Sequence, residues 1–196
     1  MRRYVAVVAV LLALTGCVRT LHPLYTQKDL AFDPALLGAW ELENSDRQER
    51  WDFRKAGDKK YILLHTDDSG RKARLTVRLV EVEGHRFLDL RPQKQKKMNN
   101  LLRLHLHPVH TFLRVKSIEP LRFAAMSPSW LREHLKQNPD ALEYVNPEDL
   151  PPVVTAGTEK LQEFVLAHLN TEGAWGDIVK FRRIDQQEKD GDHGGT

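Results

Sequence analysis

Cysteine is almost absent from this sequence, because Cys17 is the single one among 196 residues. One cysteine allows neither a disulfide framework nor a zinc site of several cysteines within the chain. Long hydrophobic runs are also scarce: the longest covers eleven residues, 4–14, and a helix that spans a bilayer needs about 20 residues. The sequence therefore argues against a disulfide-stabilised domain and against an integral membrane protein with helical spans.

The excess of basic over acidic residues is also small. The chain has 30 basic and 27 acidic residues, a formal net charge of +3. Arg2 and Arg3 lie in a segment that we expect to be removed, which leaves 28 basic against 27 acidic residues and a net charge of +1. Nucleic-acid-binding domains usually carry a clear basic excess, so the sequence predicts no nucleic-acid partner.

Recognisable catalytic motifs are missing too. The sequence has no Gly-x-Ser-x-Gly element and no glycine-rich phosphate loop. No pair of carboxylates stands where the sequence alone predicts a raised pKa. We therefore predict a non-enzymatic protein that needs no cofactor.

Residues 1–16 have the pattern of a secretory signal peptide. Arg2 and Arg3 precede the apolar run, and the small residues Thr15 and Gly16 follow it. As a helix, the apolar run would measure about 16 Å, against about 30 Å for the hydrocarbon core of a bilayer. The segment is thus predicted to direct export and then to be cleaved.

Residues 14–17, Leu-Thr-Gly-Cys, resemble the lipobox of bacterial lipoproteins. In that family the cysteine is diacylated and becomes the N-terminus after cleavage. The resemblance implies acyl chains on Cys17 that anchor the protein to the bacterial cell envelope, since two or three chains hold far more firmly than one. Val18 stands where an aspartate would signal retention in the inner membrane, so the resemblance favours the outer membrane, facing the periplasm. An ordinary signal peptide followed by a chance cysteine is the alternative.

Residues 17–32 are interpreted as the lipidated N-terminus and a tether. Fifteen extended residues reach at most about 50 Å. Several apolar side chains, such as Leu24 and Leu30, are unusual for a free linker, so we expect part of this stretch to pack on the domain. The strings at residues 22–26 and 32–38 resemble those of a group of uncharacterised bacterial lipoproteins, which implies no known activity.

Residues 33–184 are predicted to form one β-rich domain, and residues 185–196 a disordered polar tail. Asp33 and Pro34 favour a short helix that ends at Gly38. The sequence Gly38-Ala39-Trp40 resembles the Gly-x-Trp element of lipocalins. That resemblance implies a barrel whose floor is closed by Trp40, with an arginine of the last strand, Arg182 or Arg183, stacked on it.

Alternating apolar residues predict about eight short antiparallel strands. The first expected strand begins at Trp40. The others cover residues 51–55, 60–65, 72–82, 86–91, 101–107, 111–118, 121–126 and 177–184. Two helices are expected at residues 127–137 and 158–169, the first capped at Ser127 and the second at Thr158. They should lie on the sheet or plug an open end of the barrel. The fold class is therefore mostly β with minor α: a lipocalin-like antiparallel barrel or sandwich with two packed helices.

A barrel of about eight strands can be filled by side chains or can hold one small ligand. The first hypothesis is a binding module for a small apolar or amphipathic ligand. The second is an interaction protein whose filled barrel displays loops to another envelope component. The candidate lining residues are Trp40, Trp51, Phe53, Tyr61, Leu75, Val77 and Leu79.

A histidine cluster supports a third hypothesis, metal binding. In a strand, His105 and His107 would share a face, and His110 could join them from the next turn. Neutral imidazoles suit zinc, copper or nickel. Solvent-exposed residues on the rim of the barrel are the alternative.

The loop around Lys94, Lys96 and Lys97, next to Arg91, is basic. A solvated loop is the default interpretation of such a run. Contact with anionic envelope polymers or lipid headgroups is the alternative.

Overall fold

The computed structural model describes residues 17–43, 49–93, 99–146 and 152–184. The predictions of a signal peptide at residues 1–16 and of a tail at 185–196 lie outside the described residues. The lysines of the basic loop, at residues 94–97, lie outside them too.

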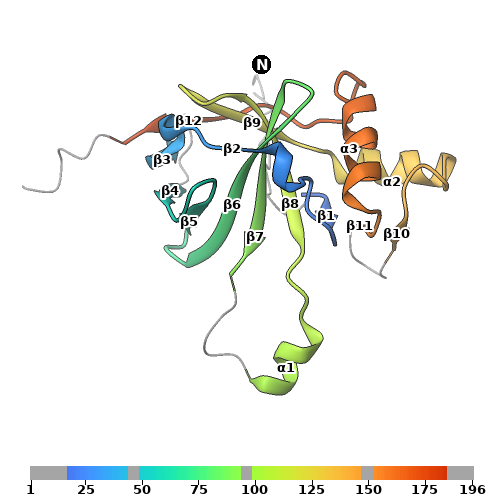
Figure 1. Ribbon diagram of the computed structural model, residues 1–196, viewed down its shortest axis with the longest axis horizontal. Coiled ribbons are helices and arrows are strands. Elements are labelled where there is room, and N and C mark those ends of the chain that lie inside the picture. The colour runs from blue at the N-terminus through green and yellow to red at the C-terminus, as the bar shows by residue number, and fades with distance from the viewer. Residues whose placement is uncertain (1–16, 44–48, 94–98, 147–151, 185–196) are drawn as a thin grey trace, which may run out of the picture.

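Eight antiparallel strands form a closed barrel (Figure 1). In chain order they are β3 (Gly38–Leu42), β4 (Arg50–Lys55), β5 (Tyr61–Thr66), β6 (Lys72–Val82), β7 (His85–Pro92), β8 (His110–Ser117), β9 (Leu121–Ala125) and β12 (Val179–Arg183). Consecutive strands pair from β3 to β8, β12 joins β3 to β9, and pairing of β8 with β9 closes the ring. The prediction of a mostly β, lipocalin-like antiparallel fold is confirmed, in its barrel form.

Two helices cover the outside of the barrel wall. They are α2 (Pro128–Gln137) and α3 (Thr158–Ala167), on the same side of the molecule in Figure 1. Their apolar faces form a second hydrophobic core with outward side chains of the wall, among them Val80, Phe87 and Phe112. The helices therefore lie on the sheet, one of the two arrangements expected. No helix among the described residues is long and apolar enough to cross a membrane.

The start of α2 agrees with the sequence and that of α3 differs from it. The Ser127 hydroxyl accepts a hydrogen bond from the Trp130 amide, which is the predicted cap. For α3 the N-cap is Gly157, and the Thr158 hydroxyl instead donates to the carbonyl of Pro23 at 2.9 Å. Thr158 thus ties the helix to the N-terminal segment.

The N-terminal segment belongs to the fold. The expectation that part of residues 17–32 packs on the domain is confirmed, and the packed part is longer than a tether would allow. β1 (Arg19–Thr20) pairs with β8, and β2 (Leu30–Ala31) pairs with β6. Short strands β10 (Tyr144–Val145) and β11 (Val153–Val154) extend the sheet beyond β1. Val18 and Leu24 are buried in the core beneath the helices. The apolar side chains at these positions pack against the hydrophobic core of the domain, whereas those of a free tether would stay in solvent.

Residues 101–107, predicted as a strand, instead begin in a short helix, α1 (Asn100–His105). The Asn99 side chain accepts hydrogen bonds from the amides of Leu101 and Leu102, which starts a helical turn. Alternating leucines indicate a strand only where a neighbouring strand can pair with them. Here β7 and β8 pair through residues 87–90 and 111–114, and the connection between them leaves the sheet.

Candidate functional site

The floor of the barrel is built around Trp40. The short 3₁₀ helix η3 (Pro34–Leu36) starts at Asp33, as predicted, and the Trp40 indole donates to the carbonyl of Leu36 at 3.0 Å. The Arg183 guanidinium lies 4.3 Å from the centre of the Trp40 ring, a cation–π contact. Of the two candidate arginines, Arg183 therefore stacks on the tryptophan.

The guanidinium of Arg183 also binds backbone carbonyl groups in and just after η3. It donates to the carbonyls of Leu37 and Ala35, each at 2.6 Å. Arg182, in contrast, points outward and pairs with Glu41. Arg183 thus joins the last strand to both the floor helix and the tryptophan.

The predicted lining residues come together inside the barrel. Six of them are buried in one hydrophobic cluster: Trp40, Trp51, Phe53, Tyr61, Val77 and Leu79. Leu75, the seventh, lies at the edge of the cluster and is half-buried. The sequence therefore identified one face of the sheet correctly.

Aromatic rings occupy the interior at the level of Trp51. The centre of its ring lies 5.2 Å from that of Phe123 and 5.2 Å from that of Phe181, and the two phenylalanine rings are 5.4 Å apart. These separations are those of rings in direct contact. The sequence analysis missed Phe123 and Phe181, although the inward face of their predicted strands could have identified them.

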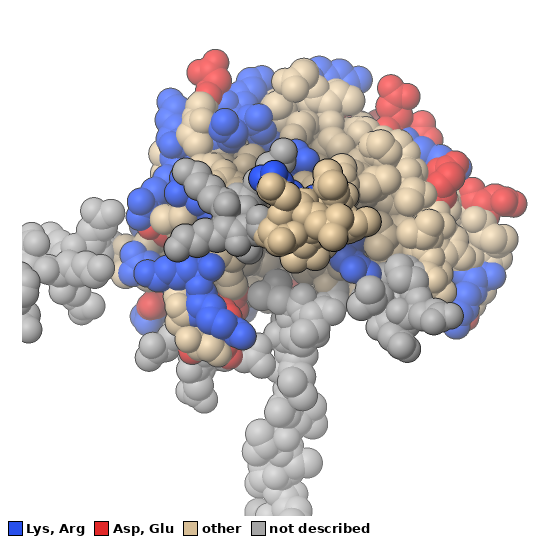
Figure 2. Space-filling model, turned by 90° about the horizontal axis from the view of Figure 1, so that it is seen from below, with Lys and Arg blue, Asp and Glu red and all other residues tan. Residues whose placement is uncertain are grey.

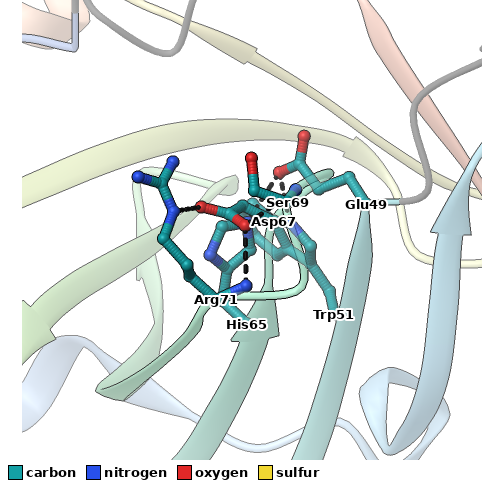
Figure 3. A network of polar contacts seen from close by, with 6 residues as sticks. All are labelled: Glu49, Trp51, His65, Asp67, Ser69 and Arg71. Carbon is teal, nitrogen blue, oxygen red and sulfur yellow. Dashed lines mark hydrogen bonds and ion pairs between the residues drawn. The ribbon is translucent and has the colours of Figure 1, made fainter.

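The end of the barrel away from η3 carries a buried polar group. Glu49 stands one residue before β4 and shares the inward face of Trp51. Its Oε1 accepts a hydrogen bond from the Trp51 indole at 2.9 Å and lies 2.9 Å from His65 Nε2 (Figure 3). The carboxylate therefore satisfies an indole N–H that would otherwise be buried without a partner.

A tight turn lies beside this polar group (Figure 3). The Asp67 carboxylate accepts hydrogen bonds from the amides of Ser69 and Arg71 and from the Arg71 guanidinium. Burial alone would raise the pKa of Asp67, but these hydrogen bonds outweigh it and lower the pKa. An ionised Asp67 thus keeps the turn between β5 and β6 in one shape next to His65. The contacts of Glu49 with Trp51 and His65 give the carboxylate a structural role at this end of the barrel.

The histidine cluster is not assembled as a metal site. His110 is buried, and its Nδ1 lies 2.7 Å from Asp89 Oδ1. His105 ends α1 and His107 follows it, and both side chains are exposed. The described residues contain no group of three or more His, Cys, Asp or Glu side chains that could hold a metal ion. The metal interpretation was wrong because it assumed a strand where the chain forms a helix and a loop.

Asp89 and His110 have a structural role under the N-terminal segment. Asp89 Oδ2 accepts a hydrogen bond from the Leu24 amide at 2.9 Å, and only 2% of Asp89 is exposed. A buried carboxylate with partners on both oxygens fixes the segment that passes over it. Sequence analysis missed this pair because the two residues lie on neighbouring strands, 21 positions apart.

A polar hollow of about 420 Å³ adjoins Asp89 on the outer wall. Arg78 and Arg91 line it, together with Tyr25 and Thr76. The Arg78 guanidinium donates to the carbonyl of Lys59 at 2.6 Å, which holds that side chain along the wall. The hollow is therefore a surface feature separate from the barrel interior.

An apolar loop stands out from the barrel between β7 and β8 (Figure 1). It contains α1, and four leucines on it are exposed: Leu101, Leu102, Leu104 and Leu106. Exposed leucines in such a group mark a surface that meets another molecule more often than scattered ones do.

Searches of protein-family models, of curated proteins and of solved structures found no match to this chain.

Proposed function

We propose that the protein is a lipid-anchored, non-enzymatic interaction protein of the bacterial cell envelope. The packed barrel is its scaffold, and the exposed loop around α1 is its contact surface. One observation carries the proposal: aromatic rings in mutual contact occupy the barrel, whereas the exposed leucines gather on a single loop.

The packing of the interior favours this function over a carrier of small apolar ligands. A ligand at the level of Trp51 would have to displace at least one of three contacting rings. Burial of one such side chain contributes about 1.5–3 kcal/mol to folding. A ligand that replaced a ring would have to offset that loss before it gained any affinity.

The anchor in this proposal is Cys17, at the end of the lipobox-like residues 14–17. Val18 is already buried, and Arg19 pairs with β8. Because the fold begins so close to Cys17, acyl chains there hold the barrel directly at the bilayer surface. A long spacer between the membrane and the domain is not part of the proposal.

Intact-mass measurement of the full chain, produced in a bacterium that processes lipoproteins, tests the anchor. The protein from the membrane fraction should lack residues 1–16 and carry the mass of two or three acyl chains. The matched variant Cys17→Ser should keep residues 1–16 and gain no acyl mass. A wild-type chain with an unmodified Cys17 would refute the anchor.

Native mass spectrometry of the same detergent-solubilised protein tests the packed interior. We expect only the polypeptide with its covalent acyl chains. A reproducible adduct of small-molecule mass that Val77→Phe removes would overturn the packed scaffold in favour of a ligand carrier, because Val77 lies inside the barrel.

A further inference from the structure

The loop around α1 concentrates most of the exposed apolar surface of the described residues. Among the described residues, six large hydrophobic side chains are exposed. Four of these are the α1-loop leucines, each with 51–81% of its surface accessible to solvent. The other two stand alone: Val145 lies on β10, and Ile178 lies just before β12. Single exposed hydrophobic residues are ordinary, whereas four on one loop need an explanation.

The loop keeps its shape through polar contacts of its own. The Asn99 side chain caps the first turn, and the Arg103 guanidinium donates to the Asn100 side chain at 2.7 Å. Leu101 and Leu104 are three positions apart and so lie on the same side of the helix. The leucines therefore project into solvent from an ordered turn, where a surface outside the molecule can cover them.

The charge around the loop has one sign. The sequence has no acidic residue between Asp89 and Glu119, and five lysines and arginines stand in the stretch from Arg91 to Arg103 that includes the loop. Arg114 and Lys116 follow farther along β8, away from the loop. In the view of Figure 2 the loop faces the reader, and the charged side chains that adjoin it are basic. An apolar tip with basic neighbours complements a surface that is anionic outside and apolar beneath.

We propose that the α1 loop inserts its leucines into the headgroup–acyl boundary of an anionic lipid bilayer. The inference rests on the proposed role of the loop as contact surface, but it does not depend on acylation of Cys17. A bilayer fits better than a protein partner, since the cores of protein interfaces are enriched in Tyr, Trp and Phe. Residues 99–107 contain none of these three residue types.

A tryptophan placed on the loop reports its depth in the membrane. Leu104→Trp keeps the position apolar, and Leu104 is the most exposed of the four leucines. The control is Val145→Trp, because Val145 is also exposed but lies on β10. Both full-length variants are mixed with vesicles of phosphatidylglycerol and phosphatidylethanolamine with brominated acyl chains, and with brominated phosphatidylcholine vesicles.

We expect the emission of the Leu104→Trp variant to shift to the blue and to be quenched more than that of Val145→Trp. The effect should be larger on the anionic vesicles, because the charged side chains that adjoin the loop in Figure 2 are basic. In a second experiment, the doubly substituted Leu101→Ser/Leu104→Ser chain should lose the protection from hydrogen exchange that vesicles give to α1. Its unfolding midpoint should stay that of the wild type, because both side chains are exposed.

Three outcomes would overturn the inference and are distinguishable. If the protein cosediments with vesicles but Leu104→Trp is quenched no more than Val145→Trp, the anchor stands and the membrane contact of the loop is wrong. If the protein does not cosediment, both membrane proposals fail. If vesicles leave the Leu104→Trp emission unchanged and a second protein shifts it, the loop is a protein-docking site.

Discussion

Gly38 is the position at which a single methyl group should do most damage to the barrel floor. Its φ is +112°, a conformation that residues with a side chain rarely adopt. A Cβ there would lie 2.8 Å from Nη1 of Arg183, the nitrogen that donates to Leu37. Gly38→Ala should therefore strain the backbone and also push Arg183 away from Trp40.

The cost has two parts of known size. A non-glycine residue in a sparsely populated backbone region costs about 1–3 kcal/mol. Displacing Arg183 weakens its cation–π contact with Trp40, which contributes about 0.5–2 kcal/mol. It also weakens the hydrogen bond from the guanidinium to the Leu37 carbonyl, which contributes about 1.5 kcal/mol. We expect Gly38→Ala to lower the free energy of unfolding by about 3–6 kcal/mol, a large part of the stability of a single domain.

Urea unfolding separates the two parts. Gly84→Ala is the control for backbone strain, because Gly84 has φ +75° and no atom lies within 4 Å of its added Cβ. That variant should lose about 1–2 kcal/mol. In an Arg183→Ala background, Gly38→Ala should cost little more than the control does, since the clashing guanidinium is gone. An equal cost of Gly38→Ala with and without Arg183 would refute the proposed clash.

Three further predictions concern packing, a buried charge and pH. Phe181→Ala should lower the free energy of unfolding by about 3–5 kcal/mol in urea titrations, because it empties space beside Trp51; a loss below about 1 kcal/mol would contradict a packed interior. Asp89→Ala should make the chain near Leu24 more sensitive to limited proteolysis, since it removes the carboxylate that accepts a hydrogen bond from the Leu24 amide. Unchanged cleavage would show that this hydrogen bond does not hold the N-terminal segment in place. Burial and then His168 lower the pKa of His134, so the unfolded chain binds protons more readily than the folded one and stability falls as pH drops below about 6.5. The unfolding midpoint should therefore decline from pH 7.5 to 5, and His134→Gln should reduce that decline; an identical decline in both proteins would exclude His134 as its source.

The elements that the sequence predicted best are those whose pattern is local. Alternation over residues 72–82 matches β6 from end to end, and Ser127 with Pro128 marks the start of α2. The pattern of Gly38 and Trp40 located the floor. In each case the residues that determine the structure are neighbours in the chain, so one sequence is enough to find them.

The elements that the sequence missed depend on partners far away in the chain. Arg19 pairs with Val153 across the β1–β11 ladder, and a two-residue strand shows no periodicity of its own. The site residue Glu49 is one position before its strand, and only the folded barrel brings it to His65. Leucines at alternate positions in the α1 loop fit a strand equally well until the neighbouring strands are known to leave them unpaired. Non-local pairing therefore decided each of these outcomes.

The position of the N-terminal segment connects the two proposed membrane contacts. In the antiparallel β1–β8 ladder Thr20 lies opposite His110 and Arg19 opposite Thr111, so the chain that leads back to Cys17 runs away from the α1 loop, and the two contacts are separate points on the barrel. Leu106 is five residues before Thr111, so the Cα atoms of Leu106 and Thr111 are at most about 17 Å apart. An acyl anchor alone would leave the barrel free to rotate about one point, whereas a second contact through the α1 loop would fix its orientation on the bilayer. The Leu101→Ser/Leu104→Ser substitutions should then leave the amount of anchored protein unchanged and alter only how the barrel lies on the membrane.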